Sequence, residues 1–508
     1  MVHCGAARGH RGSGPGPRAP GAPPSDQQHE GSIMTGVDRS IPEFDIEVPV
    51  VVVGAGAAGL AATLAACDSG AGTLLLERDV VPYGSTCMSQ GNVCAAGTRL
   101  QRENGIEDDA EALYRDIMAR SKGTADTGVS RTVADNCGPA IDWLVDRFRI
   151  PFRLDLSWGG FFGHTVNRLH GVPSKTGKEL HDTMMRAAEA AGADIVTGAH
   201  VDTVYADAEG RVAGVRVTRA DGAVETIGCK ALILATCGFG ANAGMVRRFI
   251  PSFGEAPYYK YFGHEGNEGE GIEWGMALGA AVGSMDAFQG YGALVESAGV
   301  ICNYDPIMNG GIMVNLEGRR YSNEVKDISA QSLNTLQQPE GIGWVIFDDA
   351  RRATCEDLPE FRELKALNVV RTAGDAGALA ELIKVPAEAL EATIAETQRM
   401  AKGEVPCPFG RDFTRNPPLS GRLHAIRTTG ALFHTQGGLK IDGTARVVRE
   451  DGSPLPNLFA SGGTAESISG SGCDGYLPAA GLCTAITLGM LAGRAAAELV
   501  GDAAMADA

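Results

Sequence analysis

The stretch VVVGAGAAGLAATLAA, residues 51–66, constrains this chain more than any other part of its sequence. The apolar run at residues 48–53 is typical of a fully buried parallel strand. Gly54 permits a tight turn, Gly56 lets the backbone approach a pyrophosphate, and Gly59 lets the next helix pack on the strand. The first N–H groups of that helix are free to bind phosphate. This order of strand, glycines and helix predicts a dinucleotide-binding domain.

A second strand, GTLLLE, ends in Glu77. Glu77 follows Gly59 by about 18 residues, a spacing at which an acid accepts hydrogen bonds from ribose hydroxyls. Its charge would repel the 2′-phosphate of NADP. The two strands, the glycines and the acid together predict an α/β fold with a doubly wound, Rossmann-like sheet.

FAD is favoured over NAD because the candidate contacts are spread along the chain. The loop at 83–98, YGSTCMSQGNVCAAGT, offers hydroxyl and N–H groups to a ribityl chain and a pyrophosphate. Two apolar strands that end in glycines follow, KALILATCGFGAN at 230–242 and LPNLFASGGTAESISG at 455–470. The candidate cofactor-binding residues are Gly54, Gly56, Ala57, Ala58, Gly59, Glu77, Arg78, Ser85, Thr86, Ser89, Gly91, Val201, Thr236, Gly238, Gly462, Gly463, Gly481 and Leu482.

Composition excludes several classes of partner. The chain has 44 basic and 62 acidic residues, a net charge of −18, which argues against nucleic acid because phosphate binding needs a basic face. The 12 cysteines contain no CxxC spacing, so we expect no metal or iron–sulfur cluster. Unpatterned cysteines in a large enzyme favour reduced thiols and a cytoplasmic location.

The two ends of the chain hold segments that need separate interpretations. Residues 1–40 are rich in Gly, Pro, Ala and Arg and lack the apolar core of a secretory signal, so we expect a disordered tail. The uncharged run LPAAGLCTAITLGMLAG, residues 477–493, is too short and too rich in small residues to span a bilayer. We therefore expect a buried helix there and no membrane span.

The chain resembles the flavoproteins related to fumarate reductase and 3-ketosteroid dehydrogenase, over about residues 46–495. The resemblance lies in the motifs VVVGAGAAGLAA, GSTCMSQG, TVNRLHGVPSKTGKEL, LILATCGFGAN, GNEGEGIEWGMALGA, GGIMVNLEGRRYSNE, FHTQGGLKID and LPNLFASGGTAES. It implies a Rossmann-like FAD-binding domain in two segments, 41–286 and 434–508, with an α+β cap domain, 287–433, inserted between them. Relatives that attach FAD covalently carry a histidine where this chain has Ser85, so non-covalent FAD is expected.

The resemblance also points to the substrate site, where the two branches of the family differ. Fumarate reductases carry a proton-donating cap arginine at the position of Ile328, and ketosteroid dehydrogenases carry a tyrosine base there. A second arginine of the reductases matches Tyr476, which is closer to the ketosteroid side. The cap histidine of the reductases matches Tyr291, whereas His434, in FHTQGG, keeps the reductase pattern.

Charge then favours a neutral substrate. A dicarboxylate brought beside a desolvated flavin needs paired cations, and Ile328 and Tyr476 supply none. A ketone oxygen needs only donors, such as Tyr476 and a backbone N–H near Ala480. Polarisation acidifies the α-hydrogen, a base removes it, and the β-hydride passes to flavin N5. The candidate bases are Tyr291 and, second, Asp327.

These observations predict α,β-dehydrogenation, or the reverse ene-reduction, of a cyclic or steroid-like ketone or enone, with a separate electron acceptor or donor. Two alternatives stay open. One is a fumarate- or urocanate-type reductase, in which His434, Arg168 and other cations would have to converge. The other is a catalytically idle flavoprotein that carries electrons. Packing roles for Tyr291, Tyr476 and His434, and structural roles for Arg168 and His170, are also open, and the sequence does not indicate an oligomeric state.

Overall fold

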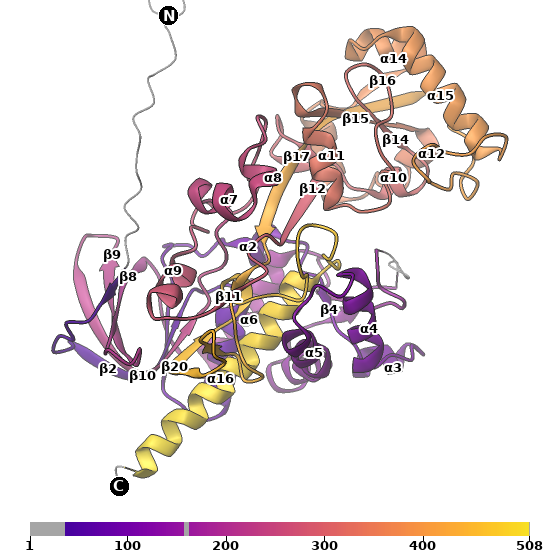
Figure 1. Ribbon diagram of the computed structural model, residues 1–508. Helices are drawn as coiled ribbons and strands as arrows, with labels where there is room; N and C mark the ends of the chain where they lie inside the picture. Colours follow the sequence, from indigo (N-terminus) through magenta and orange to yellow (C-terminus); the bar gives the residue numbers. More distant parts are fainter. Residues whose placement is uncertain (1–35, 157–161, 507–508) are drawn as a thin grey trace, which may run out of the picture. The chain divides into compact units, whose positions relative to one another are not determined.

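The computed structural model describes residues 36–156 and 162–506, with side chains up to residue 502 (Figure 1). Its largest sheet has nine strands, and most of them follow the order β1-β8-β9-β10-β2-β3-β7. The strands β10, β2, β3 and β7 are parallel neighbours. They span Val224–Leu234, Ile46–Val53, Thr73–Leu76 and Asp194–Val196. The doubly wound α/β prediction is confirmed.

Two distant segments of the chain complete this sheet. The late strand β20, Pro454–Ala460, pairs in parallel with β10, so the C-terminal part of the chain lies one strand away from β2. The antiparallel strand β19, Arg446–Val448, covers the other side of β20. The nucleotide-binding sheet is therefore assembled from both ends of the described chain.

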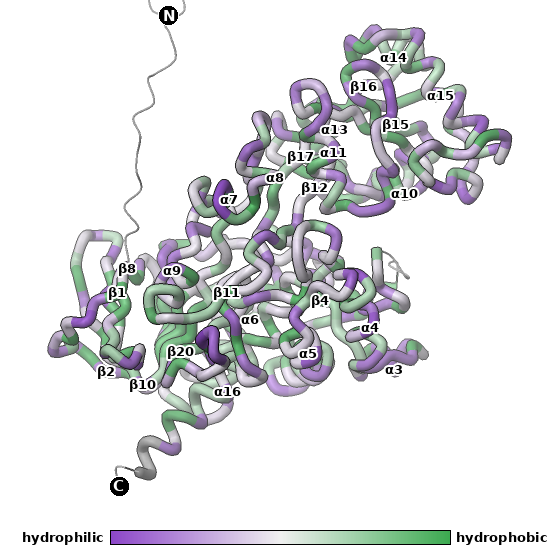
Figure 2. Tube along the Cα trace, viewed as in Figure 1, coloured by the Kyte–Doolittle hydropathy of each residue, from purple (hydrophilic) through white to green (hydrophobic). Residues whose placement is uncertain are grey.

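Small residues allow two helices to pack tightly beside the sheet. Helix α1, Ala57–Asp68, follows β2 directly, and helix α16, Ala480–Ala506, packs along it. A Cβ at Gly489 would lie 2.3 Å from Ala58 O, and one at Gly493 would lie 2.1 Å from Ala62 O. Glycine is therefore required at both crossing points. Figure 2 shows hydrophobic residues along the strands near β10 and β20 and hydrophilic residues along α3, Arg99–Glu103.

Among the described residues, one helical segment, Ala480–Asp502 of α16, is long and apolar enough to cross a membrane. Of its most hydrophobic window, 72% is buried inside the protein. This burial agrees with the core helix that the sequence predicts.

An antiparallel layer adjoins the parallel strands. Strands β8, Ala199–Ala206, and β9, Val212–Arg219, form a hairpin that joins β10. Strand β1, Val37–Asp38, pairs with β8. The tail predicted for residues 1–40 therefore extends too far, because residues 37–38 are part of the sheet. Residues 1–35 lie outside the described part.

A second, six-stranded sheet follows the order β13-β12-β17-β15-β14, with β16 also paired to β17. The outer strands β13, β14 and β16 span Val300–Ile301, Ile312–Val314 and Arg371–Ala373. Its neighbouring strands are antiparallel. The central strands β12, β17 and β15 span Phe288–Val295, Leu423–Thr435 and Ile342–Asp348. Helices α11, α14 and α15 accompany this sheet at Ala330–Leu336, Ala376–Ile383 and Ala387–Ala401. We call the part of the chain from β12 to β17 the cap, and its division at 287–433 stays a prediction.

Candidate active site

The three glycines of the first motif differ in what surrounds them. Gly54 has φ 104°, and a Cβ there would lie 2.4 Å from Ala235 O. A Cβ at Gly59 would lie 1.8 Å from Gly54 O, so α1 packs on the turn only because residue 59 is glycine. At Gly56 a Cβ would meet only Thr86 Oγ1, at 3.5 Å. The backbone at Gly56 is therefore open to a ligand, as the approach of a pyrophosphate requires.

The surroundings of α1 fit a dinucleotide. The N-cap residue Gly56 has no capping side chain. Ala57 N donates to Thr86 Oγ1, so the N–H groups of Ala58 and Gly59 are the ones that phosphate oxygens can use. The carboxylate of Glu77 is held in place, because its Oε2 accepts from Ala55 N at 2.7 Å and its Oε1 from Asp79 N at 3.0 Å. Each oxygen keeps a further lone pair that can accept from a ribose hydroxyl. These residues fit the adenosine and pyrophosphate parts of FAD.

The ends of β10 and β20 meet beside the same helix. A Cβ at Gly463 would lie 2.7 Å from Gly238 N, and one at Gly462 would lie 2.9 Å from Ala58 Cβ. Thr236 Oγ1 lies 3.2 Å from Thr464 Oγ1. The loops after residues 53, 234 and 460 therefore converge, although they are far apart in sequence.

The loop that follows β3 lies close to the same place. Thr86 Oγ1 accepts from Ala57 N at 2.9 Å. Ser85 Oγ lies 3.5 Å from Cys237 Sγ and accepts from Asn267 Nδ2 at 3.0 Å. Of the other predicted cofactor contacts, Ser89 donates to Thr86 O at 2.7 Å, and Gly91 has φ 71°. Arg78 lies beside Asp79 and Glu270, and Val201 is buried in β8. Gly481 and Leu482 lie in the first turn of α16.

Tyr476 and His434 meet at the start of α16. Their rings are 5.6 Å apart between centroids and stand edge to face at 74°. A Cβ at Gly481 would lie 3.2 Å from His434 Cε1, 3.4 Å from His434 Nε2 and 3.9 Å from the Tyr476 hydroxyl oxygen. A hydroxyl group and an imidazole edge therefore converge on the backbone of Gly481.

Both of these groups are uncharged. Burial lowers the pKa of His434 to about 4, so the imidazole is neutral near pH 7. Burial also raises the pKa of Tyr476, against a smaller opposing effect of hydrogen bonds to the backbone of Gly481 and Ala479. Tyr476 therefore keeps its proton and can donate it to an acceptor.

Arg120 joins this region to the cap. It ends helix α4, Ala110–Arg120, and its Nε donates to Tyr476 O at 3.1 Å. Its guanidinium also forms an ion pair with Asp327, whose side chain is 8% exposed. Burial raises the pKa of Asp327, while Arg120 and the backbone N–H of Ala330 act in the opposite direction. Asp327 thus lies near the site as a paired, desolvated carboxylate.

Tyr291 makes packing contacts inside the cap, and its role as the catalytic base stays a prediction that these contacts do not favour. Its hydroxyl donates to Cys302 O at 3.0 Å inside the cap. Its ring stacks on Phe433, with 4.9 Å between centroids, and meets Tyr304 edge to face. Burial raises the pKa of Tyr291 far above its usual range. Tyr291 is a packing residue of β12.

The cationic residues needed for the diacid alternative are not free. Arg168 is fully buried and forms ion pairs with Asp108, at 2.7 Å, and with Asp116. His170 lies between Thr98 Oγ1, at 2.9 Å, and Arg168 O, at 2.8 Å. Both residues therefore have the structural role that the sequence left open. Ile328 packs against the apolar cluster of the cap that contains Tyr291 and Phe347.

Sequence reasoning missed Arg120 and Gln436. Arg120 stands in MARSKGT, which carries no motif, and only the fold places it beside Tyr476. Gln436 lies inside the quoted motif FHTQGG, two residues after His434. A polar residue next to a candidate site histidine was a signal that could have identified it.

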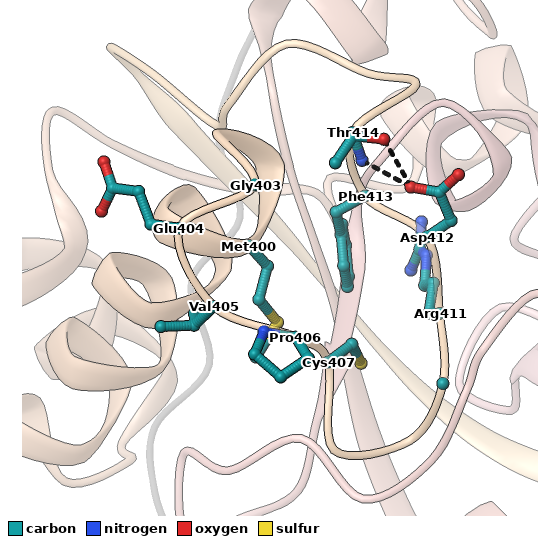
Figure 3. A pocket seen from close by; sticks show the side chains of 11 residues that line it. Met400, Gly403, Glu404, Val405, Pro406, Cys407, Arg411, Asp412, Phe413 and Thr414 are labelled. Atoms are coloured by element: carbon teal, nitrogen blue, oxygen red, sulfur yellow. Dashed lines mark hydrogen bonds between the residues drawn. The ribbon is translucent and has the colours of Figure 1, made fainter.

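A separate cavity of about 510 Å³ lies in the cap (Figure 3). Its lining includes Met400, Cys407, Arg411 and Phe413, and none of the predicted site residues. Arg411 donates to Glu324 at 2.9 Å and to Ile307 O at 2.6 Å, so its guanidinium is held by the cap itself. We assign this cavity no part in the proposed reaction.

Comparison with known proteins decides the family. The family described as FAD binding domain matches residues 49–484. The chain belongs to this family. FAD is therefore its cofactor, and the glycine geometry and the convergent loops fit it.

Two enzymes illustrate the relationship. The chain is 28% identical over 452 residues to the NADH:fumarate oxidoreductase of Klebsiella pneumoniae (strain 342), covering 88% of this chain but only 47% of that enzyme, so it spans about half of that relative. It is also 28% identical over 458 residues to the fumarate reductase (cytochrome) of Shewanella frigidimarina, covering 89% of this chain and 77% of that enzyme.

Solved structures confirm the fold and include the ketosteroid branch. A flavocytochrome c3 fumarate reductase in an open conformation matches with a TM-score of 0.77 and 25% identity, over 90% of this chain and 79% of that one. The 3-ketosteroid-Δ4-(5α)-dehydrogenase from Rhodococcus jostii RHA1, solved with 4-androstene-3,17-dione, matches with a TM-score of 0.71 and 26% identity, over 90% and 98%. The chain thus belongs with FAD-dependent oxidoreductases whose members act on CH–CH bonds.

Proposed function

We propose that this flavoprotein oxidises or reduces the CH–CH bond next to the carbonyl of a cyclic or steroid-like ketone. The observation that carries the proposal is the pair of uncharged groups, Tyr476 and His434, that converge on Gly481. Two such donors suit a ketone oxygen, which is neutral and has two lone pairs. They do not neutralise a carboxylate, which would remain unpaired in a desolvated site at a cost of several kcal/mol.

The charges around the pair support a neutral substrate. The guanidinium of Arg120 donates to the backbone carbonyl of Tyr476, and it is already paired with Asp327. Arg168 is paired with two aspartates in the core. Both guanidinium groups therefore lack the free charge that would hold a diacid.

Each residue then has a defined role. Tyr476 donates its hydroxyl proton into a hydrogen bond with the carbonyl oxygen and stabilises the negative charge that develops there. His434 is the second donor to that oxygen. Asp327, whose pKa burial raises, is the candidate base that takes the α-proton. Bound FAD would supply the acceptor for the β-hydride, which carries both electrons.

Reduction of a diacid is the second candidate, because the two relatives described above are fumarate reductases. The two candidates differ in one assay of the full chain loaded with FAD. A 3-ketosteroid and cyclohexanone are offered with an artificial electron acceptor, and fumarate is offered with reduced viologen. We expect turnover of a ring ketone and little conversion of fumarate. Fast conversion of fumarate with inert ketones would overturn the proposal. Bound FAD that no substrate bleaches would indicate a protein that only carries electrons.

A further inference from the structure

A buried polar network lies behind the imidazole of His434. Gln436 Nε2 is 2.7 Å from His434 Nδ1. Gln436 Oε1 accepts from Ser467 Oγ at 2.7 Å and from Ser469 Oγ at 2.8 Å. Gln436, Ser467 and Ser469 are each at most 4% exposed. In a buried network of this kind, each donor faces a definite acceptor.

The orientation of the Gln436 amide follows from its neighbours. The amide nitrogen also lies 3.4 Å from Thr435 O, an acceptor that cannot donate. In a flipped amide, the N–H groups would donate to the two buried serine hydroxyls, whose own protons would then have no acceptor among the described contacts. The amide oxygen therefore faces the two serine hydroxyls, and the amide N–H faces His434.

This orientation fixes the proton of the imidazole. Since Gln436 donates to Nδ1, that nitrogen must accept, and a neutral imidazole then carries its proton on Nε2. The competing contact, from Nδ1 to Thr435 O, is 3.5 Å long, beyond the usual range of a hydrogen bond. Because burial lowers the pKa of His434 to about 4, a doubly protonated ring is not populated near pH 7.

We propose that Gln436 is a positioning residue that, with Ser467 and Ser469, holds His434 as its neutral Nε2–H tautomer. The Cε1–Nε2 edge is the part of the ring that faces Gly481, where a Cβ would lie 3.4 Å from Nε2 and 3.9 Å from the Tyr476 hydroxyl oxygen. His434 and Tyr476 thus offer two uncharged N–H and O–H donors to one carbonyl oxygen. This last step rests on the proposed function, whereas the tautomer does not.

Nitrogen NMR of the FAD-loaded chain, labelled with 15N-histidine, tests the tautomer directly. Signals of His434 are assigned by their loss in H434N. In the unchanged protein we expect a protonated Nε2, a bare Nδ1 and no titration from pH 6 to pH 8. In Q436M the donor to Nδ1 is gone, and part of the population should carry its proton on Nδ1. In Q436E the carboxylate requires a donor, so Nδ1 should be protonated and the pKa of the ring should rise from about 4 into the neutral range. Q337E, at an exposed glutamine, is the matched control and should change none of these signals.

A bare Nε2 in the unchanged protein would overturn the inference, and this measurement needs no variant that might fold poorly. Unchanged His434 signals in both Q436M and Q436E would overturn it as well. In the ring-ketone assay, Q436M should lower kcat by up to about 100-fold, as the loss of one oxyanion donor does, and leave FAD binding intact. If no ketone is turned over by the unchanged protein, the proposed function fails, and the NMR result still decides the tautomer.

Discussion

The start of α16 and the cap sheet each hold a tyrosine that the sequence marked as catalytic, and the two environments differ in kind. The Tyr291 hydroxyl donates to Cys302 O, and its ring stacks on Phe433. Tyr476 faces His434 and the backbone of Gly481. Both phenols are desolvated, and burial raises the pKa of both. The difference shows that burial alone does not identify a catalytic phenol. A hydroxyl can act on a substrate only if its proton is not already donated to another group of the protein.

The difference between Tyr476 and Tyr291 is tested most directly by removing each hydroxyl in turn. We expect Y476F to lower kcat on a ring ketone by about 10²–10³-fold, because one donor to the developing oxyanion is lost. Y291F should retain kcat within about 3-fold, because that hydroxyl contacts only the cap. Steady-state kinetics with an artificial acceptor measures both, and FAD content serves as the folding control. Equal losses in the two variants would show that the distinction between the tyrosines is false.

The two tyrosines also show how much of the candidate site can be predicted from the sequence. The cofactor cradle was predictable because Gly54, Gly56 and Gly59 perform backbone roles that no other residue can, within one short stretch. Tyr476 was found through a motif, but its neighbourhood was not, because the packing of α16 brings Arg120 within reach across 356 positions of the chain. The packing contacts of Tyr291 could not be predicted, since its partner, the carbonyl of Cys302, is a backbone group that any residue presents. Contacts of this kind depend on the register of β12 and leave no mark in composition or spacing.

A smaller effect should come from filling the space between the two site groups. In G481A, the new methyl group would lie 3.2 Å from His434 Cε1, so the ring must move by a few tenths of an ångström. We expect kcat of the FAD-loaded variant to fall about tenfold, since modest misplacement of a catalytic group is costly. FAD content is measured separately, because Gly481 is also a candidate cofactor contact. Kinetics together with a flavin spectrum would check this. Unaltered kcat would mean that the substrate oxygen does not lie between His434 and Tyr476.

The loss of unfolding free energy should be larger in Y291F than in Y476F, the opposite of their order in kcat. Y291F leaves Cys302 O without its donor in a buried site, so we expect the free energy of unfolding to fall by about 1 kcal/mol. Urea denaturation of the cap-containing full chain measures this loss. Y476F should lose less, because removing its hydroxyl leaves no buried carbonyl among the described residues without a donor. A larger loss in Y476F would make Tyr476 a structural residue.

The smallest effect should appear in the pH dependence of stability. The pKa of His434 is about 4 in the folded protein and about 6.5 when unfolded, so the unfolded chain binds the proton more tightly. The contribution of the neutral His434 to the free energy of unfolding is therefore fully present above pH 6.5, and it is lost as the pH falls from 6.5 towards 4. At pH 6 the contribution of this single group is a fraction of 1 kcal/mol. H434Q should unfold with a shallower acid dependence than the unchanged chain between pH 7.5 and pH 6, measured by urea midpoints at each pH. If H434Q and the unchanged chain lost stability equally as the pH falls, the imidazole of His434 would be solvated. The site would then not be desolvated, and the reason for preferring two neutral donors over a cation would be removed.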